Sequence, residues 1–229
     1  MKLKWLKQSI DDESDRKLIF FFGGWGLGDQ VVEHLMFDEF DVLFLNDYRN
    51  LSFYFSLNES IIFERYQERI LVAWSFGVAA ASSWVANSFA FTFDRKIAIN
   101  GTMQAVDRYL GIPEAIVKKT KDTLSNESFK LFAQRCFGNE DMMFELTAIN
   151  IDACGEELDV FLNSETIEIN GWDTVWLSRN DEIFPANNML KSWHQYNQQK
   201  NMNEQATIYT IDAPHAPFRQ WKRWREIVV

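Results

Sequence analysis

The chain has 229 residues, which is enough for one well-buried core and too few for two ordinary independent domains. Hydrophobic residues make up 47% and aromatic residues 15% of it, a composition that excludes an intrinsically disordered protein. The formal net charge of −10 argues against a protein that wraps nucleic acid or lies flat on an anionic membrane.

Short, continuous apolar segments recur along the chain and predict buried strands at residues 18–22, 42–45, 70–74, 97–99, 174–177 and 207–211. Continuous rather than alternating hydrophobicity is typical of strands that are covered on both faces of a parallel sheet. Helical patterns lie between these segments, at residues 30–36, 59–68, 77–88, 186–198 and 218–228. The alternation predicts an α/β fold with a mostly parallel central sheet, helices on both faces and right-handed crossovers.

One region breaks this alternation. From residue 103 to about residue 165 there is no convincing strand, and helical patterns follow one another at residues 113–124, 127–137, 141–148 and 156–162. We therefore expect a helical lid, residues 103–165, inserted into a core that is formed by residues 1–102 and 166–229.

The segment AWSFG at residues 73–77 places Ser75 directly between a predicted strand and a helix of small residues. A serine in such a sharp strand-to-helix turn has its hydroxyl exposed above the sheet edge, where it acts as a nucleophile. The turn requires small residues two positions before and two after the serine, and Ala73 and Gly77 meet this requirement. The competing interpretation is that Ser75 is an ordinary helix N-cap.

Four glycines occur in the six residues Gly23–Gly28, directly after the first strong strand. Such a loop lets backbone N–H groups point at a developing oxyanion, and we expect the donors to be the amides of Trp25 and Phe76. The spacing matches neither GxGxxG nor GxxxxGK[ST], which argues against a phosphate-binding loop. A purely structural glycine turn remains an alternative.

A catalytic base and an acid are expected later in the chain, in the order Ser, Asp, His. His215 lies in the predicted loop between the last strand and the last helix, whereas His34 and His194 lie in predicted helices. Asp181 follows the penultimate strand, and Glu182 and Asp212 are weaker candidates for the acid. The sequence thus predicts the triad Ser75, Asp181 and His215, which is the signature of a serine hydrolase.

Two features bear on cofactors and location. Cys136 and Cys154 lack CxxC spacing and have no histidine nearby, which argues against a metal site. No signal peptide is visible, and the longest early apolar run is far shorter than the roughly 20 residues of a membrane span. We expect a cytoplasmic protein without a metal or organic cofactor and without nucleic-acid or membrane partners.

Several of these motifs resemble a known family: GGWGL at residues 23–27, AWSFG at 73–77, Asp181-x-x-x-Pro185 and the late His215. They are similar to those of the pimeloyl-acyl carrier protein methyl ester esterases, and most to the compact BioG type that replaces the BioH esterase in some bacteria. There are two departures, because Gly23 stands where a histidine is common and Ala73 replaces the first glycine of G-x-S-x-G.

The resemblance implies an α/β-hydrolase fold and hydrolysis of the methyl ester of pimeloyl-acyl carrier protein in biotin biosynthesis, with the acyl carrier protein as partner. The residues expected to line the substrate site are Gly24, Trp25, Phe76, Phe132 and Phe184, and core packing is the alternative for each. Two other activities stay open: another hydrolase of this fold, such as a thioesterase or small-ester carboxylesterase, and a non-catalytic acyl-carrier-binding protein. An intact triad argues against the second.

Between residues 107 and 135, basic residues outnumber acidic ones six to four, although the whole chain is acidic. Because acyl carrier proteins are strongly acidic, the resemblance implies that basic lid residues dock the carrier. The candidates are Lys118, Lys119, Lys121 and Arg135, and a solvated helix face is the alternative.

Overall fold

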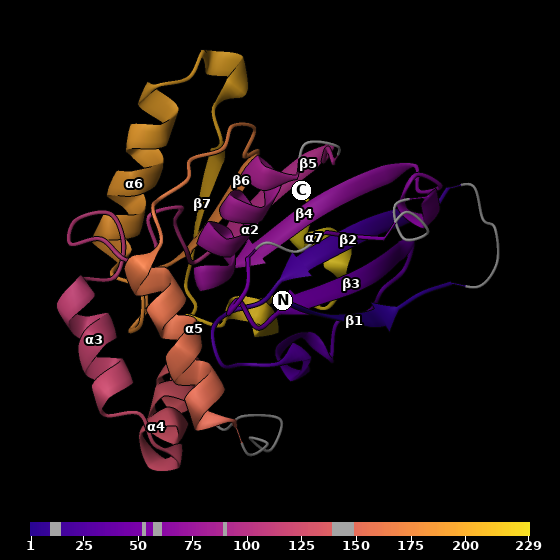
Figure 1. The fold of residues 1–229 in the computed structure, drawn as a ribbon. Helices are drawn as coiled ribbons and strands as arrows, with labels where there is room; N and C mark the ends of the chain where they lie inside the picture. Colours follow the sequence, from indigo (N-terminus) through magenta and orange to yellow (C-terminus); the bar gives the residue numbers. More distant parts are fainter. Residues whose placement is uncertain (10–14, 52–53, 57–60, 89–90, 139–148) are drawn as a thin grey trace.

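The computed structural model describes residues 1–9, 15–51, 54–56, 61–88, 91–138 and 149–229, and one seven-stranded sheet forms its centre (Figure 1). The order across the sheet is β1-β3-β2-β4-β5-β6-β7, and each neighbouring pair is parallel except β1 with β3. The strands are β1 (Lys2–Lys7), β2 (Lys17–Phe22), β3 (Phe40–Asn46), β4 (Glu68–Trp74), β5 (Arg95–Ile99), β6 (Thr174–Ser178) and β7 (Thr207–Ile211). The predicted mostly parallel sheet and its six predicted strands are confirmed.

Strand β2 shows why the apolar segments are continuous. Phe20 and Phe22 point to one face, where Phe22 packs on Trp84 of helix α2 (Phe76–Asn87), and Phe21 points to the other face, where it packs on Trp224 of helix α7 (Trp224–Ile227). Successive side chains of a strand point to opposite faces, so a strand covered on both sides must be apolar at every position. Helices on both faces were predicted and are observed.

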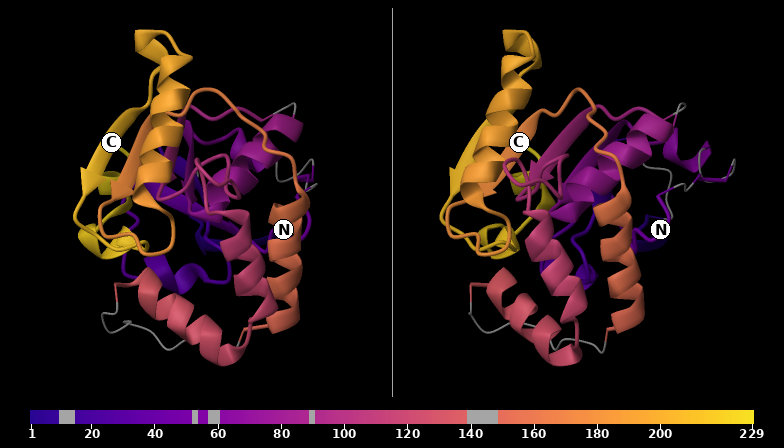
Figure 2. Two further views of the ribbon diagram at one scale, coloured as in Figure 1. Left: turned by 90° about the vertical axis from the view of Figure 1, so that its left-hand side faces the viewer. Right: turned by 60° about the vertical axis from the view of Figure 1, so that its left-hand side comes forward.

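The helices between β5 and β6 are α3 (Glu114–Asp122), α4 (Asn126–Cys136) and α5 (Ile151–Asn163), close to three of the four predicted patterns. They stand together beyond one end of the sheet, with α3 packed against α5 (Figure 1 and Figure 2). The fourth pattern, residues 141–148, lies outside the described residues. Helix α6 (Ala186–Gln198) has the predicted bounds, and no helix in the described part of the chain is long and apolar enough to cross a membrane.

Two predicted helices are wrong for one shared reason. Residues 30–36 form only the 3-10 turn η1 (Asp29–Val32), and residues 218–228 are split between the 3-10 turn η3 (Pro217–Gln220) and α7. The two segments pair with each other instead, since the Met36 N–H donates to Lys222 O and the Trp224 N–H donates to Met36 O. Backbone pairing of this kind requires extended chain at residues 36 and 223, which ends both helices.

Strand β1 was not predicted. Its sequence KLKWLK alternates charged and apolar residues, and it lies at the edge of the sheet with mostly exposed or half-buried side chains. The predicted helix 59–68 partly lies outside the described residues, and its last residue, Glu68, instead begins β4. A further 3-10 turn, η2 (Met202–Glu204), precedes β7.

Candidate active site

Ser75 occupies the sharp turn between β4 and α2 and is buried, with φ at 58°. This left-handed conformation is uncommon outside glycine and marks strain that the surrounding structure must hold in place. Ser75 stands at the N-cap position of α2, yet its side chain makes no capping hydrogen bond. The N-cap interpretation therefore does not account for the hydroxyl, which is directed elsewhere.

The close approach of α2 to the glycine loop explains why the residue two positions after Ser75 is a glycine, Gly77. A β-carbon added at Gly77 would lie 2.5 Å from the carbonyl oxygens of both Phe22 and Gly23. No side chain fits there without a shift of the backbone, so glycine at this position brings the start of α2 against the loop that follows β2.

The three predicted triad residues form one chain of hydrogen bonds. His215 Nε2 lies 2.8 Å from Ser75 Oγ, and His215 Nδ1 lies 2.7 Å from Asp181 Oδ2. Because an ionised carboxylate only accepts, Nδ1 carries the hydrogen and donates it in a hydrogen bond to Asp181, which leaves Nε2 to accept from the serine hydroxyl. The imidazole is 1% exposed and the Asp181 carboxylate 0%, so the chain is shielded from water.

Asp181 is itself held in place by backbone donors. Its Oδ1 accepts from the N–H groups of Ile183 and Phe184, at 2.8 and 2.7 Å, while Oδ2 faces the histidine. The ring of Phe184 is stacked on the imidazole at 6.5 Å between centroids. The Asp181 carboxylate is therefore fixed within its own loop, and an aromatic ring flanks the His215 imidazole.

The competing residues lie apart from this chain of contacts. Asp212 faces Arg179 across 3.9 Å with both side chains exposed, and Glu182 is exposed. His34 Nε2 contacts the carbonyl of Phe218, and His194 is exposed on α6. Among the described histidines, His215 is the one that contacts Ser75.

The glycine loop lies beside the serine. A β-carbon at Gly24 would lie 3.3 Å from Ser75 Cβ, so the loop backbone passes close to the hydroxyl. Phe76 is the first residue of α2, and its N–H therefore has no acceptor within the helix. Both expected oxyanion donors, the amides of Trp25 and Phe76, belong to residues that line the cavity at Ser75.

A cavity of about 240 Å³ opens at Ser75. Of the residues predicted to bind substrate, Trp25, Phe76 and Phe132 line it, while Phe184 lies behind the imidazole and Gly24 lies against Ser75. The rest of the wall is mostly apolar and comes largely from the helices between β5 and β6, a contribution that the sequence reasoning missed. Its charged members are Arg135, Asp181 and Glu182, and its other members are Ile112, Ile116, Val117, Thr120, Leu158, Ile183 and Pro185.

The four predicted docking residues differ in their surroundings. Lys118 pairs with Glu114 on the same helix, and Lys121 pairs with Asp159 of α5, both at 2.5 Å. Lys119 and Arg135 are exposed, and no carboxylate in the described ranges pairs with either of them. Arg135 also lines the cavity at Ser75, so it is a cation at the entrance.

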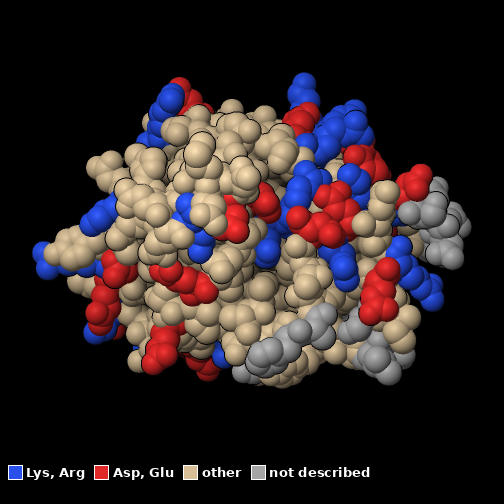
Figure 3. Space-filling model, turned by 90° about the horizontal axis from the view of Figure 1, so that it is seen from above, with Lys and Arg blue, Asp and Glu red and all other residues tan. Residues whose placement is uncertain are grey.

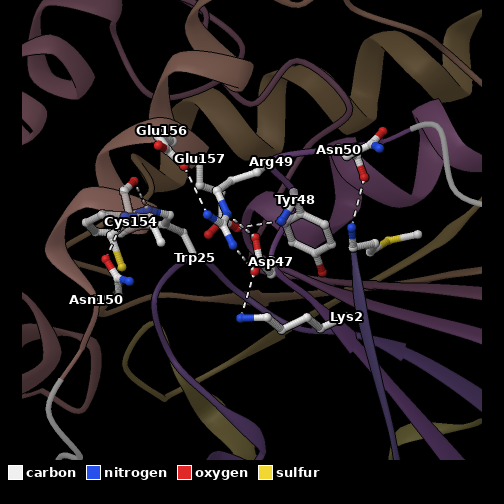
Figure 4. A network of polar contacts seen from close by, with 12 residues as sticks. Lys2, Trp25, Asp47, Tyr48, Arg49, Asn50, Asn150, Cys154, Glu156 and Glu157 are labelled. Atoms are coloured by element: carbon white, nitrogen blue, oxygen red, sulfur yellow. Dashed lines mark hydrogen bonds and ion pairs between the residues drawn. The ribbon is translucent and has the colours of Figure 1, made fainter.

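A charged network fixes the N-terminal strand to α5 (Figure 4). Asp47, which follows β3, accepts from Lys2 at 2.9 Å and from Arg49 at 2.6 Å, and Arg49 reaches Glu156 of α5 at 3.0 Å. The two cations hold the pKa of Asp47 well below its usual range. The network thereby connects β1, the turn after β3 and α5.

The neighbouring contacts connect α5 to the glycine loop. Tyr48 donates its N–H to Glu157 at 3.2 Å, and the Trp25 indole N–H donates to Cys154 O at 3.0 Å (Figure 4). The Tyr48 hydroxyl donates to Gly23 O at 2.8 Å. Burial raises the pKa of Glu157 to about 7, against the opposing effect of the Tyr48 N–H. Helix α5 therefore supports the loop that carries the expected oxyanion donor.

Comparisons with known proteins identify relatives of this chain. The family model described as pimeloyl-ACP methyl esterase BioG matches residues 3–227. An uncharacterized protein of Haemophilus influenzae is 30% identical over 231 residues, which cover 96% of this chain and 97% of that protein. A malonyl-[acyl-carrier protein] O-methyltransferase of Bacteroides fragilis is 30% identical over 188 residues, and these cover 79% of this chain but 37% of that protein. The chain thus matches little more than a third of the second relative.

Solved structures show the same fold. BioG from Haemophilus influenzae superposes with a TM-score of 0.79 at 26% identity, over 99% of both chains. An esterase from Exiguobacterium antarcticum superposes with a TM-score of 0.61 at 9% identity, over 93% of this chain and 87% of that one. The predicted α/β-hydrolase fold is confirmed.

Proposed function

The chain belongs to the pimeloyl-ACP methyl esterase BioG family, and from this premise we propose that it hydrolyses the methyl ester of pimeloyl-acyl carrier protein in biotin synthesis, with Ser75, His215 and Asp181 as its catalytic triad. The observation that carries the proposal is the buried hydrogen-bonded chain from Ser75 Oγ through His215 to Asp181, at 2.8 and 2.7 Å. The mostly apolar lining of the cavity beside Ser75 supports an acyl substrate.

The first half-reaction forms an acyl-enzyme. Ser75 Oγ attacks the ester carbonyl carbon while its proton passes to His215 Nε2, and Asp181 stabilises the imidazolium that results. The oxyanion accepts hydrogen bonds from the amides of Trp25 and Phe76. His215 then gives its proton to the methoxide oxygen, and methanol leaves.

The second half-reaction repeats these roles with water. Water attacks the acyl-Ser75 carbonyl as His215 Nε2 accepts one of its protons, and the same amides hold the second oxyanion. When the intermediate collapses, Ser75 Oγ takes the proton from His215 and the acyl chain leaves with a free carboxylate at its distal end. The residues of this chain thus complete the reaction without a further group.

The helices over the cavity fit the carrier-bound form of this substrate. We propose that residues 103–165 act as a lid on a core of residues 1–102 and 166–229, because α3, α4 and α5 all contribute to the cavity wall. The acidic carrier would dock on the basic residues of the lid, and Lys119 and Arg135, which lack intramolecular carboxylate partners in the described ranges, are the best placed of them. Lys118 and Lys121 keep part of their charge engaged in the pairs with Glu114 and Asp159.

Labelling with a fluorophosphonate tests the assignment of the nucleophile. The wild type should take up one label on Ser75, and methyl pimeloyl-acyl carrier protein should slow the labelling. The His215→Ala variant should label much more slowly because its serine has no base. If the wild type hydrolysed the ester but its Ser75 took up no fluorophosphonate label, the proposal would be contradicted.

A further inference from the structure

Asn100, the residue that follows β5, is completely buried and has φ at 43°. A left-handed conformation is rare outside glycine, although asparagine adopts it more readily than most residues. Its side chain forms hydrogen bonds with Ser178 at the end of β6 and with the loop that contains His215. These contacts lie outside the turn in which Asn100 stands.

The carboxamide of Asn100 uses both of its ends. Oδ1 accepts from the Ser178 N–H at 2.7 Å, and Nδ2 donates to Ser178 Oγ at 2.7 Å and to His215 O at 2.8 Å, with Pro214 O at 3.4 Å. The Ser178 N–H is only a donor and the His215 carbonyl only an acceptor, which fixes the orientation of the amide. An aspartate of the same shape would present a second acceptor to these carbonyls.

These partners belong to the loops that carry the triad. Ser178 ends β6 three residues before Asp181, and the carbonyl that accepts from Asn100 is that of His215 itself. The residue before Asn100 completes the set, since Ile99 O accepts the N–H of Ser75 at 2.9 Å. The last residue of β5 and the residue after it therefore contact the loops of the nucleophile, the acid and the base.

We propose that Asn100 is a positioning residue, whose carboxamide holds the loops of His215 and Asp181 in register above Ser75. The inference rests on the proposed triad. The Trp74 indole donates to the same carbonyl of His215 at 2.9 Å, so the backbone of the base is held from two directions. Without the amide, one of these restraints and the link to the Asp181 loop are lost, and a displacement of about 1 Å at a reacting group costs on the order of 10²-fold in rate.

The test compares Asn100→Asp and Asn100→Ala with Thr102→Val. Thr102 is an equally buried residue two positions along the same loop, and its hydroxyl donates to Leu110 O, away from the triad. We expect both Asn100 variants to lose about 100-fold in kcat while KM for methyl pimeloyl-acyl carrier protein changes by less than about threefold. Labelling of Ser75 by a fluorophosphonate should slow by a similar factor. Thr102→Val should lower the melting temperature but keep kcat within about threefold of wild type.

Two results would overturn the inference. One is a folded Asn100 variant with kcat near the wild-type value. The other is a Thr102→Val variant that loses as much kcat as the Asn100 variants at the same loss in melting temperature, because the effect would then be general destabilisation.

Ser178→Ala decides the question if the Asn100 variants do not fold, since it removes one partner of the amide and leaves Asn100 in place. We expect a kcat loss of about tenfold with KM unchanged, and an unchanged kcat would overturn the inference. The labelling rate does not depend on the physiological ester. A wild type that labels at Ser75 but leaves methyl pimeloyl-acyl carrier protein intact would therefore contradict the proposed substrate and not the role of Asn100.

Discussion

Among single residues, Asp181 is notable because its two carboxylate oxygens have different hydrogen-bond partners. Oδ1 accepts from the backbone N–H groups of Ile183 and Phe184, and Oδ2 accepts a hydrogen bond from His215 Nδ1. An asparagine there would present N–H to one of these sites and favour the wrong imidazole tautomer. We expect Asp181→Asn to lower kcat about 10⁴-fold with a small change in KM, measured by steady-state kinetics on the methyl ester.

Asp212→Asn is the matched control, because that carboxylate is exposed and lies near Arg179. Its kcat should stay close to the wild-type value. If Asp212→Asn were instead the variant that loses activity, the assignment of the acid would be wrong even though the His215 contact is present in the structure.

The positions of Ser75, Asp181 and His215 were predictable because each follows a strand, and parallel strands of one sheet place their carboxyl ends at the same edge. The support around them was not predictable. Asn100 and Ser178 are 78 positions apart in the sequence, and a buried asparagine after a strand carries no local signal of its partners. Only the folded structure shows that the Asn100 side chain donates to the carbonyl of His215.

Among the secondary-structure elements, the helices of the proposed lid carry cations of two kinds. Lys119 and Arg135 have no carboxylate partner in the described ranges, whereas Lys118 and Lys121 each have one. Charge reversal of Lys119 and Arg135 to Glu should raise KM for carrier-bound substrate about tenfold or more at low salt, because repulsion slows encounter with an acidic partner. The effect should shrink as salt is added. For Lys119→Glu alone, kcat on a small uncharged ester should barely change, because Lys119, unlike Arg135, does not line the cavity at Ser75.

Reversal of Lys7 and Lys222, two exposed lysines that do not line the cavity, is the control for net charge. The face of the molecule seen in Figure 3 carries both signs of charge intermixed rather than one continuous basic field. An equal rise of KM in the control would show that total charge, and not the lid, governs docking. A loss on both substrates in the lid variant would show that the lid had misfolded.

The sequence predicts those helices and strands best whose hydrophobic pattern is contained in one short stretch of the chain. Strands buried on both faces read as continuous apolar runs, and α6 shows a regular helical period from Ala186 to Gln198. Strand β1 was not predicted because an edge strand with charged outward positions resembles a polar segment. The helices predicted around Met36 and Arg223 were wrong because these segments pair across 187 positions of sequence, which no short window along the chain detects.

At the scale of the whole molecule, the buried Glu157 makes stability depend on pH. Burial raises its pKa from 4.5 to about 7, with Asp47 acting in the same direction and Arg49 and the N-terminus opposing it. The folded state therefore holds this proton longer than the unfolded state, and the contribution to stability that is present below about pH 4.5 is lost as pH rises through about 7. At about 1.4 kcal/mol per pKa unit, the loss is about 3 kcal/mol.

Glu157→Gln removes this titration and keeps an acceptor for the Tyr48 N–H. In urea unfolding, the free energy of unfolding of the variant should gain about 2.5 kcal/mol relative to wild type between pH 5 and pH 8. The control is Glu156→Gln. The side chain of Glu156, the residue next to Glu157, is 63% exposed, so this variant should show no such gain. A pH-independent difference between wild type and Glu157→Gln would mean that Glu157 does not titrate in this window.

Intact-mass analysis of the acyl carrier protein shows whether Ser75 removes the methyl group from a carrier-bound ester. Purified methyl pimeloyl-acyl carrier protein is incubated with wild type, with Ser75→Ala and without enzyme. We predict that wild type converts the carrier to a species lighter by the difference between a methyl group and a hydrogen, with the thioester arm intact, and that Ser75→Ala slows this about 10⁴-fold or more. Loss of the whole acyl chain from the carrier, or equal conversion by folded Ser75→Ala, would contradict the account.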